Sequence, residues 1–410
     1  MSTLRWLTTG ESHGPGLTVV MEGLPAGLAI SEEYIRGDLA RRQGGYGRGG
    51  RQQIETDWAQ IRSGVRHGVT IGSPITLLID NKDWENWQDV MSISPIEREF
   101  NTVTRLRPGH ADTMGSMKYN QRDVRNSLER SSARETAARV GAGALCRRFV
   151  AAFGVQVHSH VVAIGGVHLE PRDPLAIDWD AVEESPVRCI DPETAERMIA
   201  AIDAAKADGD TVGGVMEIVA TGVPIGLGSH IQWDRKLHAR IAQALMSINA
   251  VKGVAFGAGW TTADMRGSAT HDVIKPQEEW AGEGSPDGWV RPWQRRTNNA
   301  GGFEGGMTTG EPIIAQFALK PIATLHNPLP SVDLITGEVV NAHYERSDVC
   351  VVPAAGVIGE SMVAICLTEA VLDKFGGDHM EESLRNYHSY RETLGPRGGV
   401  QRQSPVASHP

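Results

Sequence analysis

The chain has 410 residues, of which 40% are hydrophobic and 22% are charged, and its formal net charge is −10. This composition is typical of a globular protein, and the excess of acidic residues argues against a general nucleic-acid binder or a protein held on anionic membranes. The four cysteines show no metal-binding spacing, as expected in a reduced compartment. We find no signal peptide and no apolar run of membrane-spanning length. We therefore expect a soluble cytoplasmic protein.

The first predicted elements are a short strand over residues 4–9, a second strand over 17–22 and a helix that begins at Ser31 and continues to Arg42. Between the strands lies the sequence Gly-Glu-Ser-His-Gly, residues 10–14. Glycines on either side of His13 indicate a sharp turn at a strand end, where side chains project into clefts. A turn histidine without a function is an equally good interpretation of this motif alone.

The helix ends in a segment rich in arginine and glycine, residues 41–53 (RRQGGYGRGGRQQ). Glycines let a backbone close around a ligand, and the guanidinium groups are forked donors for phosphate or carboxylate. We expect a mobile lid that binds anions. A solvated loop and an RNA-binding segment are the alternatives, but the single aromatic residue, Tyr46, and the nearby Glu55 and Asp57 make RNA binding a poor fit.

Two later segments resemble each other. Residues 68–75 (GVTIGSPI) lead into a predicted strand over 76–80, and residues 306–313 (GMTTGEPI) lead into one over 314–319. A looser third copy, residues 209–214, precedes a strand over 215–220, and helices are predicted over 132–151, 235–248 and 359–374. Chance similarity in a glycine-rich chain is the alternative. We expect an α+β fold, with one large catalytic domain over residues 1–394 built from repeated sheet-and-helix halves and a polar, disordered tail over 395–410.

Residues 105–148 hold the strongest candidate site. Pro108 and Gly109 shape a loop just before His110. Farther along, Ser132 and Glu135 have the spacing of a capping box, and the helix that follows has a face of alanine and glycine that predicts close, buried packing. Arg130, Ser131 and Arg134 surround its start. Because a helix N-terminus favours anions, these residues predict a phosphate site, whereas an ordinary helix cap with solvated arginines is the alternative.

Other segments carry weaker signals. Residues 84–101 and 278–296 are rich in tryptophan, proline and charge and are predicted to be surface excursions. Residues 247–253, 319–324 and 345–350 lie at the ends of predicted elements and carry polar groups. Each of these three is also explained by a structural role, namely a helix stop, a solvated turn and a surface ion pair.

Taken together, these segments resemble the chorismate synthase family from Thr8 to about Leu372. The matching motifs are GESHG (10–14), RRQGGYGRGGR (41–51), RPGHAD (107–112), RSSARETAARVGAGA (130–144), INAVKG (248–253), NNAGGFEGG (298–306), LKPIAT (319–324) and RSDVC (346–350). Many independent blocks in the same order are more specific than any single one.

The resemblance implies a β-α-β sandwich, a homotetramer and the conversion of 5-enolpyruvylshikimate 3-phosphate to chorismate and phosphate. This is a 1,4-anti elimination, in which C3 loses phosphate and C6 loses a proton, and it requires reduced FMN without net redox change. It is the last common step of the shikimate pathway to the aromatic amino acids. The resemblance also associates the chain with NADP, but no dinucleotide fingerprint or oxidoreductase module is present, so we expect a separate flavin reductase to supply reduced FMN.

The resemblance also implies residue roles. His13 would donate a proton to the leaving phosphate, His110 would stabilise the reduced flavin near N1, and Asp348 would act with flavin N5 to remove the C6 proton. The implied substrate-binding residues are Ser12, Arg42, Arg48, Arg51, Ser132, Arg134 and Arg346. The implied FMN contacts are Arg130, Ser131, Ser132, Asn249, Ala250, Gly305, Lys320, Pro321, Ile322, Ala323, Thr324 and Arg346. No metal is expected.

Two other classes of function remain open from the sequence. A flavin-dependent oxidoreductase could use the same residues, and net substrate oxidation would identify it. A non-enzymatic protein that binds anions or RNA could use the arginine-rich loop, and it would show salt-dependent RNA affinity without elimination activity.

Overall fold

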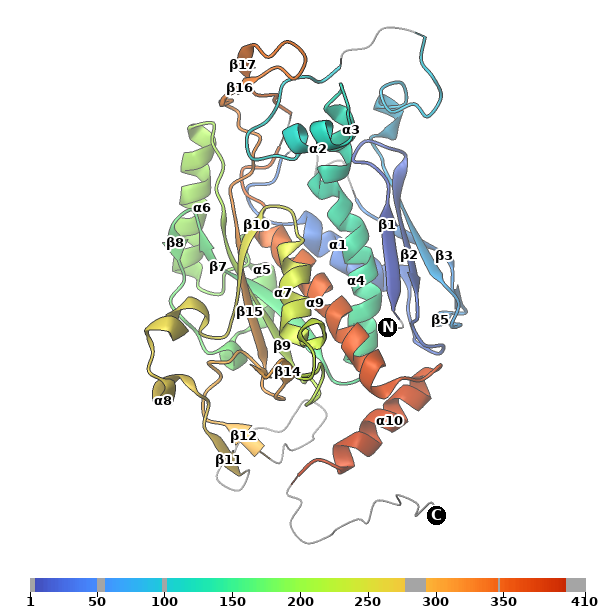
Figure 1. The fold of residues 1–410 in the computed structure, drawn as a ribbon, viewed down its shortest axis with the longest axis vertical. Coiled ribbons are helices and arrows are strands. Elements are labelled where there is room, and N and C mark those ends of the chain that lie inside the picture. The colour runs from blue at the N-terminus through green and yellow to red at the C-terminus, as the bar shows by residue number, and fades with distance from the viewer. Residues whose placement is uncertain (1–3, 50–55, 98–101, 277–292, 346, 396–410) are drawn as a thin grey trace.

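Two antiparallel sheets enclose a layer of helices in the computed structural model, which describes residues 4–49, 56–97, 102–276, 293–345 and 347–395 (Figure 1). The first sheet has the order β1 (Arg5–Thr9), β2 (Gly16–Glu22), β6 (Ile75–Asp80) and β3 (Ala59–Ser63). The second has the order β10 (Val251–Phe256), β15 (Ile313–Leu319), β9 (Gly214–Thr221), β7 (Gln156–Ile164) and β8 (Val167–His168). The helices between them are α1 (Glu32–Gln43), α4 (Thr136–Ala151), α7 (Leu237–Met246) and α9 (Val352–Phe375).

The two sheets repeat one another. The strand order β1, β2, β6, β3 in the first sheet corresponds to β7, β9, β15, β10 in the second. In each half, one helix follows the second of these strands (α1 after β2, α7 after β9). Another helix follows the strand that comes after a short hairpin (α4 after β6, α9 after β15). The hairpins are β4 (Val65–Arg66) with β5 (Val69–Thr70), and β13 (Phe303–Glu304) with β14 (Met307–Thr308). The two similar sequence segments therefore occupy equivalent positions in the two halves.

One pair of threonines shows how close this correspondence is. The Thr70 hydroxyl donates to the Pro25 carbonyl at 2.6 Å and accepts from the Leu28 amide at 2.9 Å. In the second half, the Thr308 hydroxyl makes the same bonds to the Pro224 carbonyl and the Leu227 amide, at 2.6 and 2.8 Å. The third segment, residues 209–213, forms no such hairpin and instead joins α6 (Pro192–Ala207) to β9.

Close packing of α4 on α9 forms the centre of the core. A Cβ added to Gly143 on α4 would lie 2.2 Å from the Ser361 Cβ on α9, so glycine is required at this contact. The small-residue face therefore packs as the sequence predicts. By length and hydropathy alone, α9 could cross a membrane. The expectation that no apolar run reaches that length is therefore wrong. In the fold, 94% of the most apolar window of α9 is buried, as in the core helix of a soluble protein.

Local structure at the start of α4 differs from the predicted capping box. The Ser132 hydroxyl accepts from the Arg134 amide at 3.3 Å, in a 3-10 turn over Ala133–Glu135, and not from the Glu135 amide. The Glu135 carboxylate binds the Thr8 hydroxyl and Arg139 instead. The helix thus begins at Thr136 because these tertiary partners compete for the capping groups.

The remaining elements lie around this body. They are α2 (Asp112–Lys118), α3 (Arg125–Ser131), α5 (Trp179–Glu184), α8 (Gly267–Thr270), α10 (Met380–Glu392), β11 (Ile274–Pro276), β12 (Trp293–Arg295), β16 (Pro330–Val332) and β17 (Val339–Asn341). Most of the predicted excursion over 278–296, and the predicted tail apart from residue 395, lie outside the described residues. The four cysteines are free and buried.

Equivalent connections of the two halves meet at one end of the helical layer. The described parts of the segment between β6 and α4 (residues 81–135) and of the segment between β15 and α9 (residues 320–351) lie there (Figure 1). The described parts of the α1–β3 and α7–β10 connections lie there as well. These four loops, with the β1–β2 turn, carry the candidate site.

Candidate active site

A cavity of about 530 Å³ lies where these loops meet. Its volume is in the range of small-molecule and cofactor sites. Among the described residues, five cationic side chains and three carboxylates line it: Arg42, Arg48, Arg107, Arg134 and Lys320, and Asp83, Glu345 and Asp348. The cavity therefore carries an excess of positive charge in a chain that is acidic overall, which suits an anionic ligand.

His13 comes from the tight β1–β2 turn. Gly10 has φ +101°, and a Cβ there would lie 2.3 Å from the Gly16 carbonyl oxygen, so the turn requires glycine. The His13 ring is buried, stacks on Trp87 with 3.7 Å between ring centroids, and places Nδ1 2.8 Å from a carboxylate oxygen of Glu129. This histidine is therefore held from two sides.

The Glu129 carboxyl is almost fully buried. Burial alone would raise its pKa, but hydrogen bonds from His13 and Arg125 outweigh burial and lower the pKa below its usual value. Glu129 is therefore ionised at neutral pH and acts as an acceptor behind the histidine.

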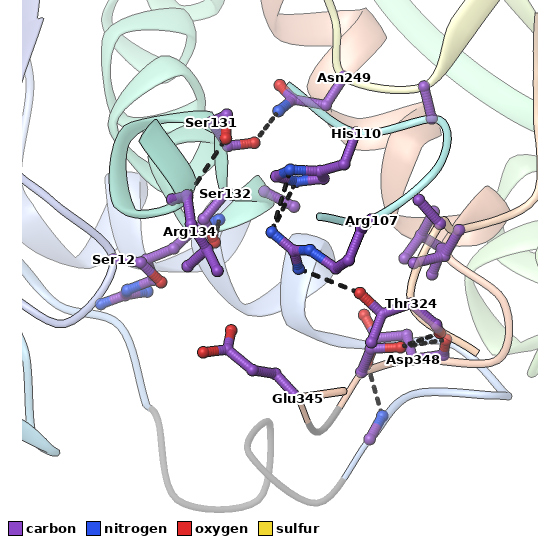
Figure 2. Close-up of a pocket in the computed structure, with 18 of the residues that line it drawn as sticks. Ser12, Arg107, His110, Ser131, Ser132, Arg134, Asn249, Thr324, Glu345 and Asp348 are labelled. Atoms are coloured by element: carbon purple, nitrogen blue, oxygen red, sulfur yellow. Dashed lines mark hydrogen bonds between the residues drawn. The ribbon is translucent and has the colours of Figure 1, made fainter. Parts of the chain in front are cut away.

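His110 is held in a similar way. In the loop before α2, its Nδ1 lies 2.5 Å from Asp112 Oδ1. The same carboxylate accepts from Arg107 Nε at 2.8 Å, and Arg107 also donates to the Thr324 hydroxyl at 3.1 Å (Figure 2). Burial opposes ionisation of Asp112, but these partners prevail and its pKa is well below the usual range. Asp112 thus anchors both His110 and Arg107.

Arg42 and Arg134 share one buried carboxylate, Asp57. Arg134 donates to Asp57 at 2.6 Å and Arg42 at 3.4 Å, while Arg42 also binds the Thr136 hydroxyl and the Ala133 carbonyl. Two guanidinium groups around one carboxylate leave a net positive charge at the cavity wall. Each guanidinium is a planar fork of N–H donors, a geometry that suits phosphate and carboxylate groups.

Asp348 is contacted by the arginine- and glycine-rich segment. Its Oδ1 accepts from the Gly49 amide at 2.6 Å, and its Oδ2 lies 3.2 Å from Arg48. The Gly47 carbonyl accepts from the Val349 amide at 2.9 Å. The described part of this segment, up to Gly49, is thus bonded to the segment before α9. That the segment is a mobile lid which binds anions stays a prediction.

Lys320 and Asn249 complete the described wall. Burial and the nearby charge of Lys252 lower the pKa of the Lys320 ammonium. Asn249 donates to the Ser131 carbonyl at 2.8 Å and so connects the α7–β10 loop to the end of α3 (Figure 2).

Comparison with known proteins gives one consistent family. The family model described as chorismate synthase matches residues 4–372. The chain is 56% identical over 398 residues to a chorismate synthase of Geobacter metallireducens, covering 95% of this chain and 99% of that protein, and 51% identical over 397 residues to one of Moorella thermoacetica, covering 95% and 100%. The chain belongs to the chorismate synthase family. It is an enzyme of the lyase class.

A solved structure agrees with this assignment. The chain matches a crystal structure of chorismate synthase with a TM-score of 0.75 and 42% sequence identity, over 95% of this chain and 98% of that one. The α+β fold is that of the chorismate synthase family.

Most of the residues that the family resemblance singles out lie around this one cavity. The residues that line it are Ser12, His13, Arg42, Arg48, His110, Ser131, Ser132, Arg134, Asn249, Ala250, Lys320, Ile322, Ala323, Thr324 and Asp348. They come from all five connecting segments, so the fold itself brings them together.

Three predicted FMN contacts do not line the cavity. Arg130 turns away and donates to the Gly10 and Thr8 carbonyls. Gly305 lies in the turn between β13 and β14, and Pro321 follows Lys320 without reaching the wall. In the single chain the Arg130 guanidinium is bonded to the β1–β2 turn, and its role at a phosphate or FMN site stays a prediction. Arg51 and Arg346 lie outside the described residues.

Several lining residues were not predicted from the sequence. Trp87 lies in what was interpreted as a surface excursion. Arg107 was quoted only as part of a motif, and Glu345 only as part of a polar segment for which a surface ion pair was the structural alternative. The carboxylates behind the wall, Glu129 and Asp112, were missed as well. Burial alone would raise the pKa of the Glu345 carboxyl. Its contacts with His343 and Arg125 outweigh burial and lower the pKa to about 2.

Proposed function

We propose that this cavity catalyses the 1,4-anti elimination of phosphate from 5-enolpyruvylshikimate 3-phosphate to give chorismate, the last common step of aromatic amino-acid biosynthesis. One observation carries the proposal: two histidines, each bonded through Nδ1 to a buried carboxylate, face a single cavity with an excess of cations. The elimination needs a proton donor for departing phosphate and a proton acceptor for C6 in the same place.

The substrate is a phosphorylated dicarboxylate, and the cationic wall is its complement. Arg42, Arg48 and Arg134 would bind the anionic groups through guanidinium donors, and Ser12 and Ser132 through hydroxyls. Arg51 and Arg346, outside the described residues, are proposed for the same role. The Nε of Arg48 is buried without a hydrogen-bond partner among the described residues, which leaves a donor for a ligand.

His13 would give its proton to the phosphate oxygen as the C3–O bond breaks. Asp348 would take the proton that leaves C6. The C6–H electron pair then becomes part of the new conjugated double bonds, and the C3–O electron pair leaves with phosphate. Gly49 and Arg48 hold the Asp348 carboxylate in place for this step. His110, backed by Asp112, would hold a proton beside the cofactor.

The wall also fits reduced FMN. It offers the polar groups of Ser131, Ser132, Asn249, Lys320 and Thr324 together with the backbone of residues 249–250 and 322–324, and the cavity volume is in the range of cofactor sites. Reduced FMN supplies an electron-rich ring to the reaction and is not consumed. We keep Arg130, Gly305 and Pro321 out of the proposed FMN contacts within one chain.

We also propose a homotetramer that works in the cytoplasm and receives reduced FMN from a separate flavin reductase. Large apolar side chains remain exposed on the single chain, among them Ile231, Trp233 and Trp260, and such surfaces are typical of subunit contacts. Light scattering coupled to gel filtration tests the assembly directly.

The elimination is tested by anaerobic incubation with 5-enolpyruvylshikimate 3-phosphate and dithionite-reduced FMN. We expect phosphate and chorismate in equal amounts, only when the flavin is reduced, and without net flavin oxidation. Net oxidation of the substrate would favour an oxidoreductase instead. No product from a folded protein that binds FMN would refute the proposed function.

A further inference from the structure

Glu129 contacts both the ring and the backbone of His13. Its two carboxylate oxygens lie 2.8 and 3.1 Å from His13 Nδ1, and Oε2 also accepts from the His13 backbone amide at 2.7 Å. The Ser12 amide donates to the Glu129 carbonyl at 3.1 Å. The β1–β2 turn and α3 are thus joined at this one residue, which is only 2% exposed.

These contacts determine which ring nitrogen carries a hydrogen. An ionised carboxylate can only accept, so Nδ1 must be the protonated nitrogen whether the ring is neutral or charged. Nε2 is then the nitrogen that gains and loses a proton. Free imidazole does not impose this choice, so the protein imposes it through Glu129.

Neighbouring groups fix Glu129 in turn. Arg125 donates to Glu129 Oε1 at 3.0 Å and to Glu345 Oε1 at 2.9 Å, so it bridges the buried carboxylate and a cavity carboxylate. The guanidinium carbon of Arg125 also lies 5.1 Å from the centre of the Trp87 ring, whose plane stacks on His13. His13 is therefore held in its plane by Trp87 and in its rotation by Glu129.

We infer that Glu129 is a positioning residue that keeps Nδ1 of His13 protonated and so assigns proton transfer to Nε2, with Arg125 and Glu345 holding Glu129 in place. The inference deepens the proposed function, because it rests on His13 acting as a proton donor. Glu129 is not among the described residues that line the cavity, so it would act on the reaction through His13.

The chain provides a matched control. Glu217 accepts from His160 Nε2 at 3.0 Å, and both residues are buried on the five-stranded sheet, away from the cavity. Glu217→Gln therefore neutralises a buried glutamate–histidine pair of the same kind, and it reports what the loss of such a pair does to the fold alone.

The first test is ¹⁵N NMR of the full-length protein labelled at histidine, with His13 assigned by the signals that vanish in His13→Gln. We expect Nδ1 to carry a proton on both sides of the ring's titration, and Nε2 to be the site that titrates. A neutral His13 protonated at Nε2 would overturn the inference. This readout needs no substrate and no turnover.

The second test compares Glu129→Gln with Glu217→Gln in the anaerobic assay. We expect kcat to fall about 100-fold in Glu129→Gln, with FMN affinity unchanged and the ¹⁵N pattern of His13 altered, and Glu217→Gln to retain wild-type kcat. Equal kcat in the two variants would overturn the inference. If Glu129→Gln does not fold, the wild-type NMR result decides. If the wild type itself gives no chorismate, the proposed function fails while the NMR result still decides the role of Glu129.

Discussion

Asp112 Oδ1 lies 2.5 Å from His110 Nδ1, while Asp112 Oδ2 binds Arg107 at 2.8 Å, so one fully buried carboxylate holds two cavity residues at once. Arg107 Nη2 also lies 3.0 Å from His110 Nδ1, so the carboxylate and the guanidinium both contact this ring nitrogen. A buried carboxylate also contacts the other cavity histidine, since Glu129 lies 2.8 Å from His13 Nδ1.

Asp112→Asn should impair both activity and stability. An amide cannot hold a neighbouring guanidinium as a carboxylate does, so buried Arg107 loses its counter-charge. We expect a loss of about 3 kcal/mol in the free energy of unfolding and about a 10- to 100-fold fall in kcat. Urea denaturation and the anaerobic assay measure the two effects. Wild-type turnover in this variant would contradict the role given to the His110–Asp112 pair.

Arg48→Gln should weaken substrate binding more than FMN binding. The change removes a charge that lies 3.2 Å from Asp348 and leaves that carboxylate with the Gly49 amide. We expect KM to rise roughly 10- to 100-fold, since a charge-assisted bond to an anion contributes about 1.5–3 kcal/mol. Arg66→Gln, on the exposed β4–β5 hairpin, is the control. A rise in KM of the same size there would rule out a specific role for Arg48.

Gly143→Ala should loosen the contact of α4 with α9. The new methyl group would lie 2.2 Å from the Ser361 Cβ, so the two helices must separate, and we expect a loss of about 1–3 kcal/mol. Gly37→Ala on α1 has no atom within 4 Å of the new methyl and should gain about 0.5–1 kcal/mol from helix propensity. Thermal denaturation distinguishes the two. Equal stability of both variants would mean that the helices do not pack as described.

Glu345 makes stability depend on acid pH. In the folded protein its pKa is about 2, against an unfolded value of 4.5, because the contacts of His343 and Arg125 with the carboxylate outweigh its burial. The contribution of the Glu345 carboxylate to the free energy of unfolding is therefore complete above pH 4.5 and is lost as the pH falls toward 2. Glu345→Gln should lose on the order of 2 kcal/mol at pH 6 and show a flatter decline between pH 4.5 and 2.

Chemical denaturation across this pH range measures the effect. Glu381→Gln, at the exposed start of α10, serves as the control. If the free energy of unfolding of Glu345→Gln falls as steeply between pH 4.5 and 2 as that of the wild type, other carboxyl groups account for the decline.

The sequence predicted those parts of the site that have local signals. The glycines beside His13, the Pro-Gly pair before His110 and the start of α1 at Ser31 all depend on neighbours in the chain, and the structure forms a turn, a loop and a capped helix there. The matching segments at residues 68–75 and 306–313 were predicted to lead into strands of duplicated halves, and they do lead into β6 and β15 at equivalent positions.

The supporting residues could not be found in this way. Glu129 meets His13 across 116 residues, and Asp57 meets Arg134 across 77. No periodicity records such pairs, and a carboxylate that will be buried has the same letter as one on the surface. Trp87 was missed for the same reason, since its partner His13 comes from another loop.

The most direct test of the central claim is chorismate and phosphate release under strict anaerobiosis by the wild type, His13→Gln and Asp348→Asn. We expect the wild type to release equal amounts of the two products, and to do so only when FMN is reduced. We also expect a fall in kcat of about 100-fold or more in each variant, with FMN affinity retained. Near-normal turnover by both variants would show that the elimination does not depend on the groups assigned to it in this cavity.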